Sequence, residues 1–324
     1  MNEAPPNPLE EERRKWAEYS TLLDAVERSK STDVERLPGL FRGVCQDLAL
    51  AQYRMQGMRA VEALNQLVIR GYKHLYRPRT VGASGIVSFL TVGFPNRVRR
   101  EWRLFWFCSL IFWLPFFGMM AAVQSDVAWA QAILGDAGML GLEEMYGGDT
   151  TRQTEHLRRE YGSNFMMFGF YIKNNVGIDF RIFGGGILAG VGTMFFLIYN
   201  GLAIGASAGY VQVAGNPTSF WSFVAGHSSF ELLGMVVAGM AGMRLGLGVL
   251  KPGRLPRGKA LALAAKEALP LICGAAVMTV LAAFVEGFWS AQPVPVNLKY
   301  AVGGVFWIAC MGYFLFMGRG RYAA

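Results

Sequence analysis

The stretch Phe180–Val213 reads FRIFGGGILAGVGTMFFLIYNGLAIGASAGYVQV and contains no acidic residue. As one α-helix it would be roughly 50 Å long at about 1.5 Å per residue, whereas the hydrocarbon core of a bilayer is about 30 Å thick. The stretch is therefore too long for one straight membrane span, and it must contain a break. We predict a helix from about Phe180 to Tyr199 and a break at Asn200-Gly201, where a polar residue precedes a glycine.

The return toward the other side of the membrane is interrupted as well. Asn216-Pro217 is typical of a turn, so we expect a helix to restart at Thr218 or Ser219. Broken helices inside a membrane need partners for their free backbone groups, which places this region inside the protein or along a cavity. Gly186 and Gly190 have the small-xxx-small spacing of closely packed helices. We interpret the spacing as packing within one subunit, with a homodimer interface as the second interpretation.

Four further apolar runs surround this stretch. Each is about the length that a membrane span needs, and they are Leu104–Val123, Gly234–Leu250, Ala268–Trp289 and Tyr300–Met317. Hydrophobic residues make up 53% of the chain and charged residues only 17%, which is unusual for a soluble domain of this size. The sequence therefore predicts an all-α protein whose residues 104–324 form a polytopic domain of about five to six spans with broken or re-entrant helices.

The distribution of charge predicts the orientation of these spans. Bases without acids occupy Lys251–Lys266, and arginines precede the first span, whereas residues 124–163 hold seven acids against three bases. By the positive-inside rule the arginine-rich segments are cytoplasmic and residues 124–163 are exterior. Both termini are then cytoplasmic and the number of crossings is even, so Phe165–Val224 crosses twice or re-enters. We expect a multi-pass protein of the bacterial cytoplasmic (inner) membrane, with the lipid bilayer as its first partner.

Residues 1–80 have a different character. Three one-sided apolar stripes predict a small bundle of cytosolic helices, the second of which starts at Ser31, Thr32 or Asp33. Acids alternate with bases here and no zinc or aromatic-basic motif occurs, so we do not expect nucleic-acid binding. Residues 81–103 combine apolar side chains with a cluster of arginines, which is typical of an amphipathic segment in the membrane interface. The arginines expected to face anionic headgroups are Arg97, Arg99, Arg100 and Arg103.

Few strongly polar groups lie inside the apolar runs. They form a candidate intramembrane polar network of Asn174, Asn175, Asn200, His227, Glu231 and Glu286. Buried charge is costly, so such groups are functional candidates. Lys173, Asp179 and Arg181 are expected at the membrane edges. With only three histidines, two of them outside the spans, we expect no metal site, and without a nucleophile motif we expect no catalytic residues, no cofactor and no enzyme.

Two interpretations of His227 remain open. Ser228-x-x-Glu231 matches a capping box, in which Glu231 bonds the start of its own helix and His227 lies outside it. If the helix instead begins near Ser219, His227 and Glu231 lie one turn apart and can interact in the membrane. Glu286 is either a carboxylate at the interface near Trp289 or a partner of His227 or Arg181.

Several segments together resemble one family. They are FPNRVRREWR (94–103), YIKNNVGIDFRIFGGGILAGVGTMFFLIYNGLAIG (171–205), HSSFELLGMVVAGMAGMRLG (227–246) and LPLICGAAVMTVLAAFVEGFWS (269–290). This set is similar to the stage II sporulation protein M-like membrane proteins. Its matching positions are Asn174-Asn175, Asn200-Gly201, His227 with Glu231-Leu232, and Glu286. Ser228 departs from the pattern, because the family commonly has glycine after the histidine.

The resemblance implies a multi-span membrane protein without known catalytic residues. It implies a scaffold that recruits partners in remodelling of the cell envelope or peptidoglycan, and a homodimer is expected. The alternative function is a transporter or channel, with His227, Glu231 and Glu286 along a polar path.

Overall fold

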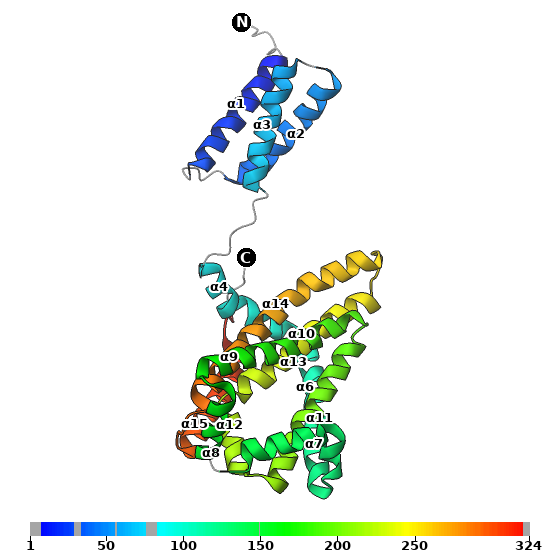
Figure 1. The fold of residues 1–324 in the computed structure, drawn as a ribbon. Helices are drawn as coiled ribbons and strands as arrows, with labels where there is room; N and C mark the ends of the chain where they lie inside the picture. The colour runs from blue at the N-terminus through cyan, green and yellow to red at the C-terminus, as the bar shows by residue number, and fades with distance from the viewer. Residues whose placement is uncertain (1–7, 29–33, 56, 76–82, 149, 320–324) are drawn as a thin grey trace. The chain divides into compact units, whose positions relative to one another are not determined.

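A computed structural model describes residues 8–28, 34–55, 57–75, 83–148 and 150–319. All regular secondary structure in these residues is helical, as the sequence predicted. The chain divides into two compact units, Met1–Gly82 and Ala83–Ala324 (Figure 1). Residues 81–103, predicted to lie in the membrane interface, thus belong almost entirely to the second unit, which we call the membrane unit.

The first unit, the head, is a bundle of three helices: α1 (Pro8–Glu27), α2 (Leu37–Tyr53) and α3 (Met58–Leu75). A short 3-10 turn, Val34–Arg36, leads into α2, while the predicted start at residues 31–33 lies outside the described residues. The apolar stripes meet in one core, whose buried members are Tyr19, Leu23, Leu37, Phe41, Val44, Ala51 and Leu64. Arg70 links α3 to α1 through Asp24 and Glu27, with Nη2 2.9 Å from Glu27 Oε2, and its hydrogen bond lowers the pKa of Glu27.

The membrane unit contains the remaining helices. In chain order these are α4 (Ala83–Ser88), α5 (Phe94–Arg100), α6 (Trp102–Ser125), α7 (Ala128–Tyr146), α8 (Thr150–Tyr161), α9 (Asn164–Tyr171), α10 (Gly177–Gly184), α11 (Val191–Ala214), α12 (Pro217–Ala225), α13 (Ser228–Leu250), α14 (Arg257–Val285) and α15 (Val296–Phe316). Single π-helical turns join α4 to α5, α9 to α10, and extend α14 over Glu286–Ser290. Five described segments are long and apolar enough to span a membrane: α6, α11, α13, α14 with its π-turn, and α15.

The predicted break at Asn200-Gly201 is wrong. The chain reverses earlier, after α10, through a 3-10 turn at Gly185–Ile187 and through Gly190, whose φ of 85° favours glycine. Helix α11 then runs unbroken through Asn200, whose side-chain amide donates to the Phe196 carbonyl of its own helix at 2.8 Å. An asparagine satisfied in this way does not interrupt a helix.

The break at Asn216-Pro217 is confirmed. Helix α11 ends at Ala214, and α12 begins at Pro217 with Asn216 in the N-cap position. The Asn216 side chain accepts from the backbone amides of Thr218 at 3.0 Å and Ser219 at 3.3 Å. Such a cap satisfies donors that have no partner within the helix.

The region between α8 and α12 contains one candidate span, α11, which follows the shorter helices α9 and α10. Helices α9 and α10, joined by their π-turn, lead from Asn164 to Gly184, and α11 returns. The two ends of the membrane unit also meet, because Arg99 donates to the carbonyls of Phe314 and Met317, both at 2.7 Å. Figure 1 shows α4 at one end of this unit and α7 and α8 at the other. Five candidate spans occur among the described residues, so the even number of crossings stays a prediction.

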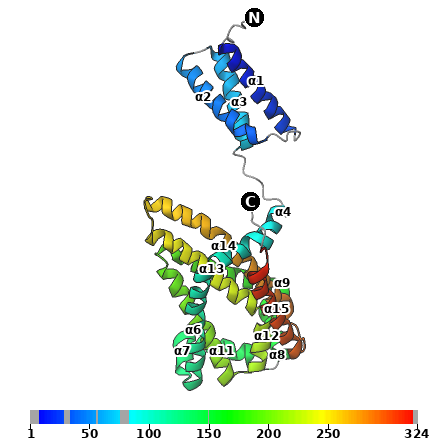
Figure 2. The same ribbon diagram turned by 180° about the vertical axis from the view of Figure 1, so that it is seen from behind.

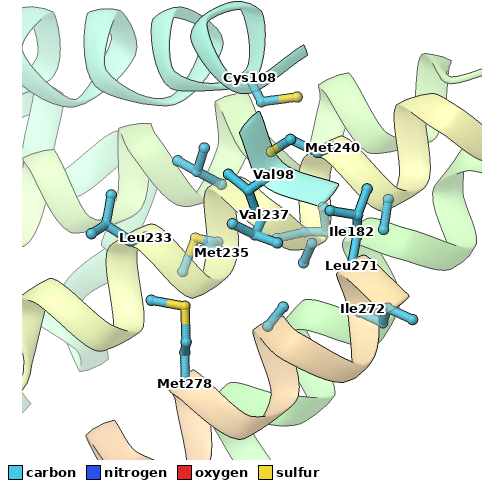
Figure 3. Packing of buried hydrophobic residues seen from close by; sticks show 14 of the residues in the cluster. Val98, Cys108, Ile182, Leu233, Met235, Val237, Met240, Leu271, Ile272 and Met278 are labelled. Atoms are coloured by element: carbon cyan, nitrogen blue, oxygen red, sulfur yellow. The ribbon is translucent and has the colours of Figure 1, made fainter. Parts of the chain in front are cut away.

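Helix α13 forms the centre of the membrane unit. Two thirds of its most apolar window, 67%, is buried inside the protein, more than in any other of the five described spans. Figure 3 shows side chains of α13 facing residues of α6, α10 and α14. The labelled members of this core are Val98, Cys108, Ile182, Leu233, Met235, Val237, Met240, Leu271, Ile272 and Met278. Figure 2, from behind, shows α13 and α14 running side by side.

Glycines allow the helices to approach one another closely. Gly201, Gly205 and Gly209 lie one turn apart on α11, and a methyl group added to any of them would collide with the backbone of α6. In the same way Gly186 lies against the backbone of Gly242 on α13. The glycine spacing at residue 186 therefore serves packing within one chain, as the first interpretation predicted.

We expect Gly205→Ala to lower the thermal unfolding temperature of the purified protein. The added methyl would lie 3.0 Å from the Phe116 Cα, and overpacking of this kind costs about 1–3 kcal/mol. Gly118→Ala is the matched control, because Gly118 is an exposed helical glycine on α6 with no atom near the added methyl. Equal unfolding temperatures for the two variants would contradict the packing of α11 on α6.

Candidate functional site

A break between two helices positions His227. Helix α12 ends at Ala225, and α13 begins at Ser228, so His227 itself occupies the N-cap position. Gly226 fits there because an added methyl would lie 2.6 Å from the indole ring of Trp289. The turn is thus held by side-chain packing against the end of α14.

Of the two interpretations of His227, the capping box is wrong. The Ser228 hydroxyl donates to the Ala225 carbonyl at 3.3 Å and accepts from the Trp307 indole of α15 at 3.1 Å. It is therefore used in contacts with α12 and α15, and α13 has no side-chain cap. As a result Glu231 is not needed at the helix start, and its carboxylate points toward His227.

His227 contacts both candidate carboxylates at once. Its Nε2 lies 3.8 Å from Glu231 Oε2 and 3.9 Å from Glu286 Oε1. The His227 side chain is 5% exposed, the Glu231 side chain 18% and the Glu286 side chain 8%. Glu231 comes from the first turn of α13 and Glu286 from the π-turn that follows α14. We call these three residues the His–Glu–Glu cluster.

The other ring nitrogen of His227 has its own partner. Nδ1 lies 3.2 Å from the Ser290 hydroxyl, and the Ser290 carbonyl accepts from Lys299 Nζ at 2.7 Å. Lys299 is 1% exposed. Neither residue was among the predicted site residues, because the predicted apolar runs ended at Trp289 and began again at Tyr300. The sequence signal that could have identified Lys299 is that it is a single base in a run that is otherwise apolar.

The cluster faces a cavity of about 770 Å³. Asn174 and Asn175 line it as well, with the Asn174 amide donating to Asn175 Oδ1 at 2.8 Å. Aromatic side chains form much of the remaining wall, among them Trp113, Phe116, Tyr146, Tyr171, Phe220 and Trp307. Five of the six predicted network residues therefore share one cavity. Asn200 is not among its described lining residues.

Residues expected at the membrane edges divide into two groups. Lys173 and Arg181 are exposed, and Arg181 donates to the Gly177 carbonyl at 3.2 Å instead of contacting Glu286. Asp179 does not lie at an edge: it is 1% exposed and accepts from the Thr279 hydroxyl at 2.5 Å. Helix α10 packs against α13 and α14 here, which turns an expected surface carboxylate inward.

The predicted surface arginines also divide into two groups. Arg97 lies 3.7 Å from Glu101 and 3.6 Å from Glu267, and Arg99 bonds the end of α15. Arg100 and Arg103 are exposed, with Arg103 over the Trp102 ring at 5.6 Å. Contact of these arginines with lipid headgroups stays a prediction.

Comparison with known proteins gives two matches to family models. The model described as stage II sporulation protein M matches residues 104–291, more than half of the chain and including the whole His–Glu–Glu cluster. A model described as a domain of unknown function (DUF8413) matches residues 9–77, which correspond to the head. No curated protein and no solved structure matches the chain.

We expect Thr279→Val to destabilise the membrane unit by about 1–3 kcal/mol, because it leaves the buried Asp179 carboxylate without its donor. Thr279→Ser, which keeps the hydroxyl, is expected to lose less stability. Thermal unfolding of the purified variants measures the difference. A serine variant as unstable as the valine variant would show that packing, not the hydrogen bond, matters at this position.

Proposed function

Because the chain belongs to the stage II sporulation protein M family of multi-span membrane proteins, we propose that it is a membrane scaffold that binds partner proteins in remodelling of the cell envelope. The observation that carries this proposal is the separate head, which has a hydrophobic core of its own. A second folded unit, in addition to the membrane unit, offers a binding surface that the spans do not need for their own packing.

Helices α7 and α8, which lie at the other end of the membrane unit from α4, offer a second surface. Helix α7 is held on the membrane helices by polar contacts: Asn216 N donates to the Tyr146 carbonyl at 2.7 Å, and the Tyr210 hydroxyl donates to Glu143. The Ser219 hydroxyl also donates to the Gly148 carbonyl at 2.9 Å. Binding to a surface ordered in advance loses less conformational entropy. This supports partner binding at α7 and α8.

The proposed role is non-enzymatic. Ser290 and His227 are arranged like a nucleophile and its base, so this pair is the strongest argument for an enzyme. However, Ser290 is 0% exposed and is not among the described residues that line the cavity. A hydroxyl without access to substrate supports a structural role for Ser290, as the partner that orients His227.

We propose that the protein lies in the cytoplasmic membrane with both termini cytoplasmic. The end of the membrane unit at which α5 and α15 meet also holds Arg97 and Arg244, which share contacts with Glu101 and Glu267. The base-rich link after α13 follows directly. Accumulation of basic residues at this end supports a cytoplasmic position.

Site-specific photo-crosslinking in intact membranes tests the scaffold. Probes at Tyr53 of the head, which is 86% exposed, and at the exposed Arg159 of α8 are expected to capture other proteins. The matched control is Ile308 of α15, 76% exposed on an apolar span, where lipid contact is expected. A second copy of this chain among the captured proteins would identify the expected homodimer. If no protein is captured at either surface, the scaffold proposal fails.

A second candidate function is transport, which the cavity with the His–Glu–Glu cluster favours. Variants His227→Ala, Glu231→Ala and Glu286→Ala, assayed for ion or solute flux in liposomes, separate the two functions. Under transport, the wild type conducts and stable variants lose at least about tenfold in flux, since intramembrane charged groups carry transport paths. Wild-type flux equal to that of empty liposomes would contradict transport.

A further inference from the structure

We infer that His227, Glu231 and Glu286 bind one divalent first-row transition-metal ion, of which Zn²⁺ and Mn²⁺ are the best matches. The inference goes beyond the proposed function, since a metal ion can serve a scaffold or a transporter. The low histidine count argued against a metal site in the sequence. The structure changes this, because it brings two glutamates from different segments to a single histidine.

The separations within the cluster fit a shared ion. Nδ1, Nε2 or carboxylate oxygens of the three residues lie within 4.8 Å of one another. The distances of 3.8 and 3.9 Å from Nε2 to the carboxylates are too long for hydrogen bonds, which are about 2.7–3.2 Å. Two ligand atoms that are each about 2.0–2.2 Å from one metal ion lie roughly 3–4 Å apart. The gaps are therefore of the size that a shared ion fills.

One of the two tautomers of His227 fits a metal ligand at Nε2. When Nδ1–H donates to the Ser290 hydroxyl, the lone pair of Nε2 points toward the two carboxylates. Three electron-rich groups then face one another in a buried site, which is unfavourable without a positive charge between them. A histidine ligand held through its other nitrogen is the usual second-shell arrangement at metal sites.

A second, independent observation is an oxygen without a partner. Glu286 Oε2 is buried and no described donor meets hydrogen-bond geometry with it, although the Tyr171 hydroxyl is near enough to interact with this carboxyl group. The Glu286 side chain is 8% exposed. A buried carboxylate oxygen without a donor is costly, and a metal ion would coordinate it. The other buried charged side chains nearby have partners of their own: Lys299 donates to the Ser290 carbonyl, and Asp179 accepts from the Thr279 hydroxyl.

The donor set selects the kind of ion. One imidazole nitrogen with two carboxylate oxygens suits zinc, manganese or iron, whereas calcium prefers six to eight oxygen ligands and copper(I) prefers sulfur. The two carboxylates balance the charge of a divalent cation. Three protein ligands leave at least one coordination position for water or another molecule, and the cluster faces the cavity of about 770 Å³.

Metal binding to the purified, tag-free, full-length protein tests the inference. The protein is first stripped of metal with a chelator and then dialysed against Zn²⁺ or Mn²⁺. Elemental analysis measures the amount of bound metal, and titration gives the dissociation constant. We expect about one ion per chain. Glu286→Gln is expected to weaken binding more than about 100-fold, and Ser290→Ala about 10–100-fold, as for loss of a second-shell partner. Glu267→Gln, on the far end of α14, is the matched control and is expected to bind like the wild type.

Two outcomes overturn the inference. Wild type that takes up neither ion shows that protons, not a metal, balance these carboxylates, and Glu286→Gln that binds like the wild type places any metal elsewhere. If Glu286→Gln fails to fold, Glu231→Gln supplies the same comparison, and the Co²⁺-loaded wild type must still show the visible absorption of a nitrogen- and oxygen-ligated ion. None of these measurements uses flux or partner capture, so their failure leaves the proposed function untouched.

Discussion

The close approach of helix backbones at glycine is the constraint on which the rest of the membrane unit depends. Lipid is as apolar as the helix surfaces, so spans gain little from hydrophobic burial against each other and must instead pack closely. Gly205 brings α11 against α6, and Gly186 brings the turn after α10 against α13. On α15, Gly303 lies against the end of α12, where an added methyl would be 2.8 Å from the Ala225 carbonyl carbon. These contacts enclose α13 and set the distances at which polar side chains can meet.

The polar site follows from this packing. Because α12 ends against α15, the chain turns at Gly226-His227 before α13 begins, and the Ser228 hydroxyl is used by Trp307. The imidazole is then directed into the protein, where the π-turn after α14 presents Glu286. A π-turn inserts one extra residue into a helix and is often found at functional sites. His227 and Glu231 meet at regular i, i+4 spacing at the start of α13, and the end of α14 brings Glu286 to them.

The sequence was informative where one local rule dominates. Long apolar runs predicted the spans, one-sided stripes predicted the core of the head, and Asn216 before Pro217 predicted a helix start. It failed where two local signals compete for one role. The glycines at 185–190 reverse the chain, so Asn200-Gly201 is not used as a break. Ser228 matches a capping box, but a tryptophan from α15, distant in sequence, binds its hydroxyl. Lys299 shows the same limit, since its partner carbonyl is defined only by the tertiary fold.

The position of the cluster connects the membrane interior to the surface formed by α7 and α8. Glu286 begins the turn that packs on α9, where a methyl group added to Gly287 would lie 3.1 Å from Phe168. His227 follows α12, whose Phe220 and Phe223 rings contact Tyr146 of α7. An ion bound by His227, Glu231 and Glu286 would tie together the ends of α12, α13 and α14. Because α7 and α9 pack against those helix ends, loss of the ion would destabilise the surface of α7 and α8 at which we propose that partners bind. Such coupling requires that the ion stabilise one arrangement of these helix ends over another, because a ligand shifts a conformational equilibrium only by its differential affinity.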